Sequence, residues 1–124
     1  MPTILVIDDS QSNAQLIKIA LETSGYQVAC AYTGQDGLAV LEEIRPDLLV
    51  LDLRLPGSTF DGWTIIRMLR DDPNYRNMPI LVTSVEVTPD DRTRAFDAGC
   101  NEYFSKPFSI GDLRQQISRY VGPP

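Results

Sequence analysis

The segment PDLLVLDLRLPG, residues 46–57, decides the fold. Its apolar run Leu48–Leu51 leads directly into Asp52 and is bounded by a proline on one side and by Pro-Gly on the other. A continuous apolar run with such boundaries is typical of a strand that is buried on both faces. Aspartate is disfavoured in strands and costly to bury without a partner, so Asp52 at the end of this strand needs a functional explanation.

Four further apolar segments are predicted to be strands: residues 3–7, 27–32, 78–84 and 102–105. Between and after the strands the apolar residues recur with helical period, and Ser10, Thr33, Thr88 and Ser109 are suitable residues to begin helices. Five strand–helix units in unbroken alternation predict a parallel sheet with helices on both faces. We expect residues 1–124 to form one such α/β domain.

Composition excludes several functions. The formal net charge is −6, which argues against direct binding to nucleic acid, since phosphate contacts need clustered Lys and Arg. The absence of histidine excludes His-based acid–base catalysis and most zinc sites. No apolar run approaches the roughly 20 residues of a membrane span and no signal-peptide pattern is present, so we expect no membrane contact and a cytoplasmic location. Cys30 and Cys100 are expected to be inert thiols.

Polar side chains stand where several of the predicted strands end. Because the carboxyl ends of parallel strands meet at one edge of the sheet, where ligands bind in such folds, we expect these residues to form one site. They are Asp8, Asp9, Asp52, Thr83 and Lys106.

The chemistry of this set points to phosphoryl transfer. Three carboxylates repel one another, and a hard divalent cation such as Mg2+ with oxygen ligands relieves that repulsion. Lys106 supplies a compact positive charge for a phosphoryl oxygen, and Thr83 supplies a hydroxyl donor. Asp52 is then the candidate nucleophile, because a carboxylate can form an acyl phosphate.

The chain resembles the receiver domain of two-component response regulators over essentially its whole length. The matching motifs are IDD (7–9), LLVLDLRLPG (48–57), ILVTS (80–84) and SKPF (105–108), which occur in the family's order and at its spacing. The resemblance implies a flavodoxin-like three-layer fold with strand order 2-1-3-4-5. It also implies that a sensor histidine kinase or histidine phosphotransfer protein phosphorylates Asp52.

The resemblance assigns further roles around this site. The Arg54 backbone carbonyl would join Asp8, Asp9 and Asp52 as a Mg2+ ligand. Thr83 and Lys106 would bind the phosphoryl group, and Tyr103 would act with Thr83 as a switch. Pro107 would follow a cis peptide bond. The last two helices would then contact an output protein or domain, and a phosphorylation-dependent homodimer is left open.

Two features depart from the family pattern. The loop at 57–61 is about two residues longer than usual, and we expect it to border the site. Arg54 and Val85 occupy positions that tune self-dephosphorylation in the family. Because both side chains are large enough to obstruct a water molecule, we expect slow loss of the phosphate.

Three other functions fit the sequence less well. An aspartyl-phosphate phosphatase typically needs Asp-x-Asp, but residue 54 is arginine. A flavin or nucleotide site is disfavoured because the loop DDSQSN (8–13) lacks glycine and carries two acids. A pseudo-receiver that only binds proteins remains the alternative, although the intact acidic residues and lysine argue against it.

Overall fold

The computed structural model describes residues 1–85 and 88–124, in which strands and helices alternate along the chain. The strands are β1 (Thr3–Ile7), β2 (Gln27–Ala31), β3 (Leu48–Asp52), β4 (Ile80–Ser84) and β5 (Glu102–Ser105). The helices are α1 (Gln11–Thr23), α2 (Gly34–Ile44), α3 (Gly62–Asp71), α4 (Pro89–Ala98) and α5 (Ile110–Val121). The predicted units are confirmed, with β2 one residue shorter and β4 two residues shorter than expected. Within the described ranges, no helix has the length and apolar character needed to cross a membrane.

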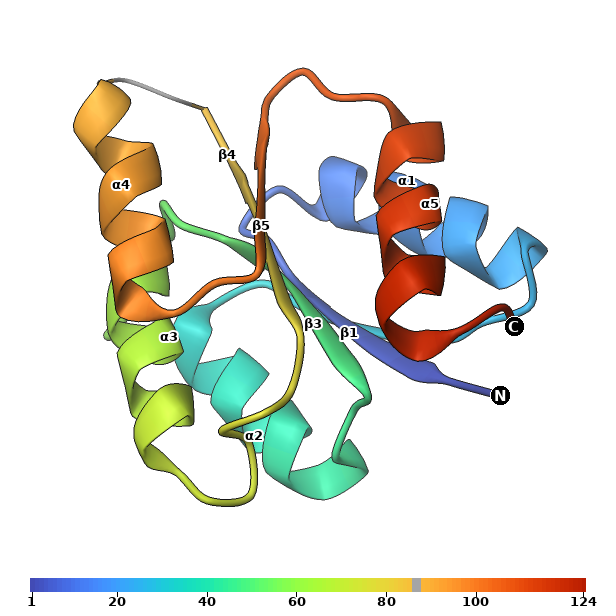
Figure 1. Ribbon diagram of the computed structural model, residues 1–124, viewed down its shortest axis with the longest axis horizontal. Coiled ribbons are helices and arrows are strands. Elements are labelled where there is room, and N and C mark those ends of the chain that lie inside the picture. Colours follow the sequence, from blue (N-terminus) through green and yellow to red (C-terminus); the bar gives the residue numbers. More distant parts are fainter. Residues whose placement is uncertain (86–87) are drawn as a thin grey trace.

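The strands form one parallel sheet of order β2-β1-β3-β4-β5. Helices α1 and α5 cover one face, and α2, α3 and α4 cover the other (Figure 1). The predicted three-layer flavodoxin-like architecture is therefore confirmed. It places every strand-to-helix loop at one edge of the sheet.

The central strand β3 is buried on both faces, as its sequence predicted. Leu49 and Leu51 belong to the apolar cluster under α2, α3 and α4, whereas Leu48 and Val50 belong to the cluster under α1 and α5. Each of these side chains is at most 1% exposed. Successive side chains point to opposite sides of the sheet, so an uninterrupted apolar run supplies both layers. Asp52 is thereby fixed at the end of a rigid strand.

Capping residues start the helices at the edge where Asp52 lies. Ser10, Thr33 and Ser109 do so as predicted. Asp61 makes the shortest of these capping bonds, since its Oδ1 accepts a hydrogen bond of 2.8 Å from Thr64 N. Thr88 occupies the N-cap position of α4 with Pro89 next, but its side chain makes no capping bond with the described residues.

The long loop at 57–61 turns toward the beginning of α2. Ser58 Oγ accepts a hydrogen bond of 2.9 Å from Gly34 N, and Thr59 N donates to Gln35 Oε1 at 3.0 Å. A Cβ atom at Gly34 would lie only 2.5 Å from Phe60 O, so glycine permits the close packing. We expected this loop to border the site. These contacts instead hold Ser58 and Thr59 against the first turn of α2.

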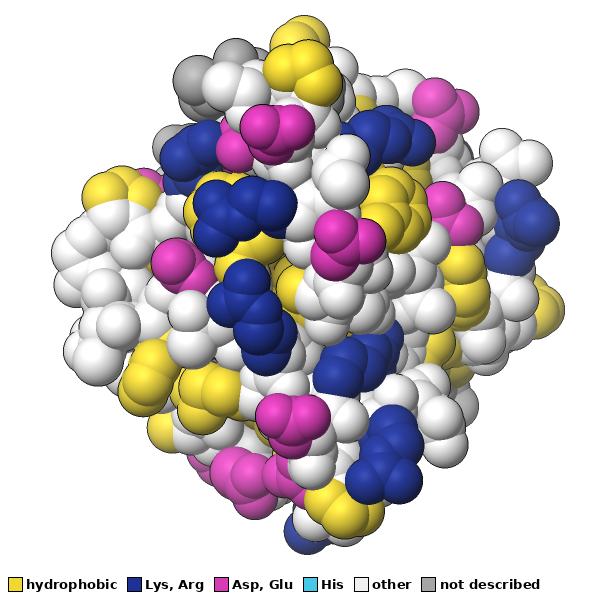
Figure 2. Space-filling view, turned by 60° about the vertical axis from the view of Figure 1, so that its left-hand side comes forward, with side chains coloured by type: hydrophobic (Ala, Val, Ile, Leu, Met, Phe, Trp, Pro, Cys, Tyr) yellow, Lys and Arg dark blue, Asp and Glu magenta, His cyan; other side chains and the backbone are white. Residues whose placement is uncertain are grey.

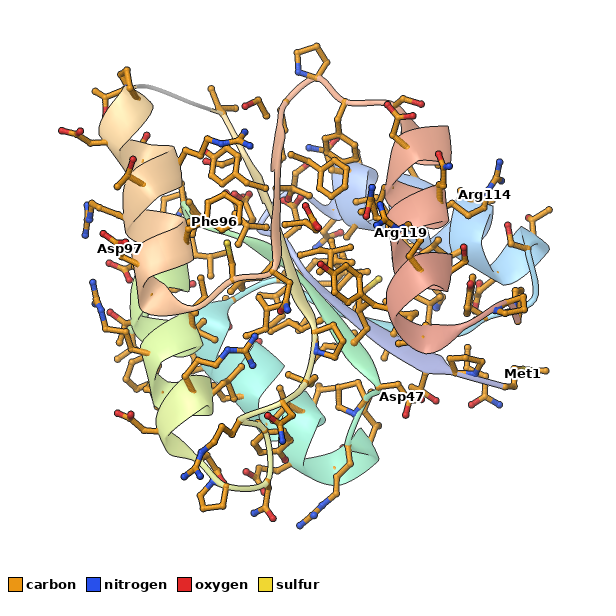
Figure 3. All side chains as sticks on the ribbon, in the orientation of Figure 1. Met1, Asp47, Phe96, Asp97, Arg114 and Arg119 are labelled. Carbon is orange, nitrogen blue, oxygen red and sulfur yellow. The ribbon has the colours of Figure 1, made fainter. Side chains whose placement is uncertain are left out.

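The opposite edge of the sheet holds the N-terminal residues (Figure 3). Asp47 Oδ2 accepts a hydrogen bond of 2.8 Å from Thr3 N at the start of β1. Tyr120 on α5 is 38% exposed, and its hydroxyl donates a hydrogen bond of 2.8 Å to Glu102 Oε1. Neither contact involves the edge that carries the acidic residues.

Candidate functional site

Three carboxylates converge at the carboxyl edge of the sheet, as the sequence predicted. Asp8 follows β1 directly, Asp9 follows it, and Asp52 is the last residue of β3. One oxygen from each of the three lies within 4.8 Å of the others. Asp8 and Asp52 are 1% and 5% exposed, whereas Asp9 faces solvent. A half-open acidic pocket results.

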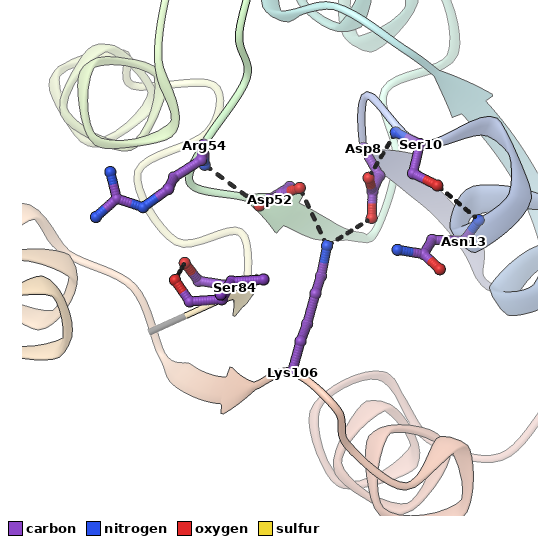
Figure 4. Close-up of polar contacts among 8 residues, drawn as sticks. Asp8, Ser10, Asn13, Asp52, Arg54, Ser84 and Lys106 are labelled. Carbon is purple, nitrogen blue, oxygen red and sulfur yellow. Dashed lines mark hydrogen bonds and ion pairs between the residues drawn. The ribbon is translucent and has the colours of Figure 1, made fainter. Parts of the chain in front are cut away.

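Lys106 reaches into this pocket from the loop after β5 (Figure 4). Its Nζ lies 3.2 Å from Asp8 Oδ2 and 3.1 Å from Asp52 Oδ2. The ammonium is itself largely buried, so both contacts are poorly screened by water. Lys106 thus joins Asp8, which is 98 positions away in the sequence, to Asp52, which is 54 positions away.

Backbone amides hold the other carboxylate oxygens in place. Ser10 N donates to Asp8 Oδ1 at 2.9 Å, and Arg54 N donates to Asp52 Oδ1 at 3.2 Å (Figure 4). Such bonds fix side-chain orientation, because each acceptor is bound by the main chain just after its own strand. The two carboxylates are therefore preorganised beside Lys106.

The pKa of Asp52 is raised to about 6, chiefly by burial. Lys106 opposes the rise, the neighbouring Asp8 carboxylate adds to it, and the bonds from Lys106 and Arg54 oppose it again. Burial alone would lower the pKa of Lys106, but the carboxylates of Asp52 and Asp8 outweigh it and raise the pKa of the ammonium. At neutral pH the pocket therefore holds carboxylates beside a protonated lysine, which leaves an excess of negative charge.

This raised pKa predicts a pH-dependent stability of the metal-free protein. Asp52 titrates near pH 6 when folded and near 3.8 when unfolded, so between these values the folded state binds more protons. The contribution of Asp52 to the free energy of unfolding should consequently fall by roughly 2 kcal/mol as pH rises from about 4 to 6. Urea unfolding in EDTA across this range measures the slope. Asp52→Asn should remove it, and parallel curves for the two proteins would contradict the prediction.

The donor set fits a hard divalent cation. Its atoms are carboxylate oxygens, with no sulfur or imidazole, and these are the ligands Mg2+ and Ca2+ take in proteins. Two positive charges would also balance three carboxylates beside one ammonium. Asp8, Asp9 and Asp52 can therefore hold a metal. The role of the Arg54 carbonyl as a further ligand stays a prediction.

Thr83 lies on β4, the strand next to that of Asp52, and Tyr103 lies on β5, one strand further out. Thr83 is level with Asp52 in the β3–β4 register and is 1% exposed. Tyr103 pairs with Val82 one position back and is 7% exposed, with the Arg92 guanidinium 5.5 Å from its ring. The Lys106–Pro107 peptide bond is cis, as the resemblance implied. Thr83 thus lies beside Asp52, Tyr103 lies two strands away, and the switching roles of both residues stay predictions.

Arg54 and Val85, expected to slow loss of the phosphate, are placed differently. Val85 is 59% exposed and lines a cavity of about 380 Å³ together with Asp8 and Lys106. The Arg54 side chain instead points away from Asp52 (Figure 4), and its Nη2 contacts Asp91 Oδ2 at 2.6 Å. In this state only Val85 stands beside the pocket.

Sequence reasoning missed the partner of Arg54. Asp91 lies in the first turn of α4 and is 5% exposed, although its sequence context is that of an ordinary acidic residue near a helix start. The one available signal is its spacing of four from Ala95, which puts both residues on the buried side of α4. That spacing gives no indication of which cation Asp91 meets.

Comparison with known proteins agrees with this geometry. The family model for the response regulator receiver domain matches residues 4–118, and the chain belongs to this family of two-component signalling modules. It is 36% identical over 117 residues to RpaA of Synechocystis, a DNA-binding dual master transcriptional regulator. It is 29% identical over 120 residues to the polar-differentiation response regulator DivK of Brucella anthropi.

Coverage differs between these relatives. The matches include 94% and 97% of this chain, but 48% of RpaA and 96% of DivK. The chain thus spans about half the length of the first relative and nearly all of the second.

A solved structure supports the same conclusion. The receiver domain of the sensor histidine kinase PA1611 from Pseudomonas aeruginosa superposes with a TM-score of 0.86 at 30% identity, covering 98% of each chain. That structure is described with a magnesium ion coordinated in its active site cleft.

Proposed function

We propose that this receiver domain accepts a phosphoryl group on Asp52 from the phosphohistidine of a sensor histidine kinase or a histidine phosphotransfer protein. The observation that carries the proposal is the buried Asp52 carboxylate 3.1 Å from Lys106 Nζ, with two further carboxylates beside it. A structural ion pair would need neither Asp8 nor Asp9. The chain would turn over no small-molecule substrate, and would catalyse only its own phosphorylation and slow dephosphorylation.

In the proposed reaction an Asp52 oxygen attacks phosphorus while the bond from phosphorus to the donor imidazole nitrogen breaks. The electron pair of that bond stays on the imidazole, and Asp52 becomes an acyl phosphate. Lys106 neutralises an oxygen of the transferred group, and Thr83 donates its hydroxyl to another. Transfer of this kind depends mainly on positioning and charge neutralisation, which the strand ends supply.

Mg2+ is the proposed cofactor, held by Asp8, Asp9, Asp52 and the Arg54 carbonyl. It would supply positive charge to the incoming phosphoryl oxygens. The all-oxygen donor set supports this assignment, as does the magnesium described in the Pseudomonas receiver domain.

The proposed output surface is formed by α4 and α5. A phosphate on Asp52 adds about −1.5 to −2 charge beside Lys106, and Thr83 with Tyr103 would relay the change. The receiver would thereby control a separate protein or another part of a longer chain in the cytoplasm. It would do so with no nucleic-acid or membrane contact of its own, and it would dimerise only if phosphorylation exposes a suitable face.

Intact-protein mass after incubation with acetyl phosphate tests the proposal. We expect a gain of one phosphoryl group that requires Mg2+ and is absent from Asp52→Asn. Asp97→Asn, which changes an exposed carboxylate on the outer side of α4 (Figure 3), should behave as wild type. An equal gain in Asp52→Asn would refute the assignment. No gain from acetyl phosphate or from a phosphohistidine protein would favour the pseudo-receiver.

A further inference from the structure

Arg54 joins the edge of the pocket to α4. Its backbone N–H binds Asp52 Oδ1 at 3.2 Å, whereas its guanidinium pairs with Asp91 on the first turn of α4. The Arg54 side chain is 43% exposed, but that of Asp91 is only 7% exposed. A nearly buried carboxylate needs a compensating cation, so this contact is unlike an ordinary surface ion pair.

The Arg54 guanidinium also packs over the ring of Trp63. Trp63 lies on α3. The guanidinium carbon of Arg54 lies 5.4 Å from the centroid of its ring, and the guanidinium carbon of Arg94 on α4 lies 4.1 Å from it. Both distances lie within the range of cation–π attraction. Basic side chains also gather on the surface that α3 and α4 form together (Figure 2). One guanidinium therefore links the loop after β3, helix α3 and helix α4.

The pocket offers Arg54 a second anionic partner once Asp52 is modified. Guanidinium binds phosphate with two parallel hydrogen bonds, and a phosphoryl group carries more charge than the single carboxylate of Asp91. Arg54 is the residue next but one to Asp52, and its amide already contacts that side chain. The phosphoryl group and the Asp91 carboxylate would thus compete for the Arg54 guanidinium.

We propose that Asp91 is a positioning residue that holds the Arg54 guanidinium on α4, and that a phosphoryl group on Asp52 draws Arg54 away and thereby frees the first turn of α4. This route to α4 does not use Thr83 or Tyr103. It rests on the proposed phosphorylation of Asp52. Since the two equilibria are linked, breaking the Arg54–Asp91 pair must favour the phosphorylated state by the same factor that phosphorylation weakens the pair.

The test measures binding of beryllofluoride, a mimic of the phosphoryl group, in the presence of Mg2+. Trp63 is the only tryptophan, so its emission reports the loss of a neighbouring guanidinium, and 19F NMR gives an independent affinity. We expect Asp91→Asn to tighten binding at least about fivefold. Without Arg54, in the Arg54→Gln background, the same substitution should have no effect. Asp91→Glu should restore wild-type affinity in part.

Asp90→Asn is the matched control, since it removes an exposed carboxylate from the same turn and should change nothing. Unchanged affinity in Asp91→Asn, or a gain that persists without Arg54, would overturn the inference while leaving the proposed function intact. Failure of the wild-type protein to bind beryllofluoride would overturn both. If circular dichroism shows that Asp91→Asn does not fold, the beryllofluoride affinity of Arg54→Gln alone tests the inference. The inference requires Arg54→Gln to bind beryllofluoride more weakly than wild type, and equal or tighter binding would overturn it.

Discussion

Arg70→Met is expected to lower the free energy of unfolding by about 3 to 5 kcal/mol. The Arg70 guanidinium, projecting from α3, donates hydrogen bonds of 2.7 to 3.1 Å to oxygens from two neighbouring segments, 75–78 and 99–101. The acceptors are the carbonyls of Tyr75, Arg76, Met78 and Gly99 and the side chain of Asn101. Methionine fills similar volume but donates nothing, so several partly buried oxygens each lose a hydrogen bond together.

Urea unfolding measures this loss, with Arg67→Met as the matched control. Arg67 lies one turn earlier on α3 and is exposed, so the same substitution should change stability by less than about 0.5 kcal/mol. If the two variants proved equally stable, Arg70 would not be the residue that holds the 75–78 and 99–101 segments together.

Gly62→Ala is expected to destabilise the fold by about 3 kcal/mol and to slow phosphorylation of Asp52. A Cβ atom at this position would lie 2.5 Å from Leu53 Cα and 2.8 Å from Asp52 O. These are backbone atoms of the strand end that carries the candidate nucleophile, so they cannot move aside without displacing the carboxylate. Stability and phosphorylation should therefore fail together.

Gly111→Ala provides the comparison for this substitution. A Cβ atom there would meet only Ser109 Oγ at 3.4 Å, so alanine should be neutral or stabilise α5 by up to about 1 kcal/mol. Thermal unfolding and the rate of phosphorylation by acetyl phosphate measure both effects. A Gly62→Ala protein with wild-type stability would mean that α3 can shift away from β3 at little cost.

The strand ends were predictable because local sequence determines them. An uninterrupted apolar run such as 48–51 predicts a strand that is buried on both faces, and the parallel topology brings the carboxyl ends of all strands to one edge of the sheet. The sequence and this topology together therefore predict that Asp8, Asp52 and Lys106 lie close to one another. Their mutual distances depend on the sheet register, which the alternation of strands and helices does not specify in detail.

The contacts of long polar side chains were not predictable in the same way. Arg54 has several rotamers, and its pairing with Asp91 depends on where α4 lies against α3. Arg70 collects carbonyls from segments up to 31 residues away, which leave no periodic pattern in the sequence. The direction of the 57–61 loop likewise depends on Gly34. The lack of a side chain at this position matters only because the Phe60 backbone packs against it.

The central claim, that Asp52 is the phosphoacceptor, is tested most directly by trapping the acyl phosphate chemically. Protein phosphorylated in the presence of Mg2+ would be reduced with borohydride, which converts an aspartyl phosphate to homoserine, and the peptides would be sequenced by mass spectrometry. The account predicts homoserine at position 52 and intact aspartate at positions 8 and 9. Homoserine at Asp8 or Asp9 with Asp52 unchanged would contradict it.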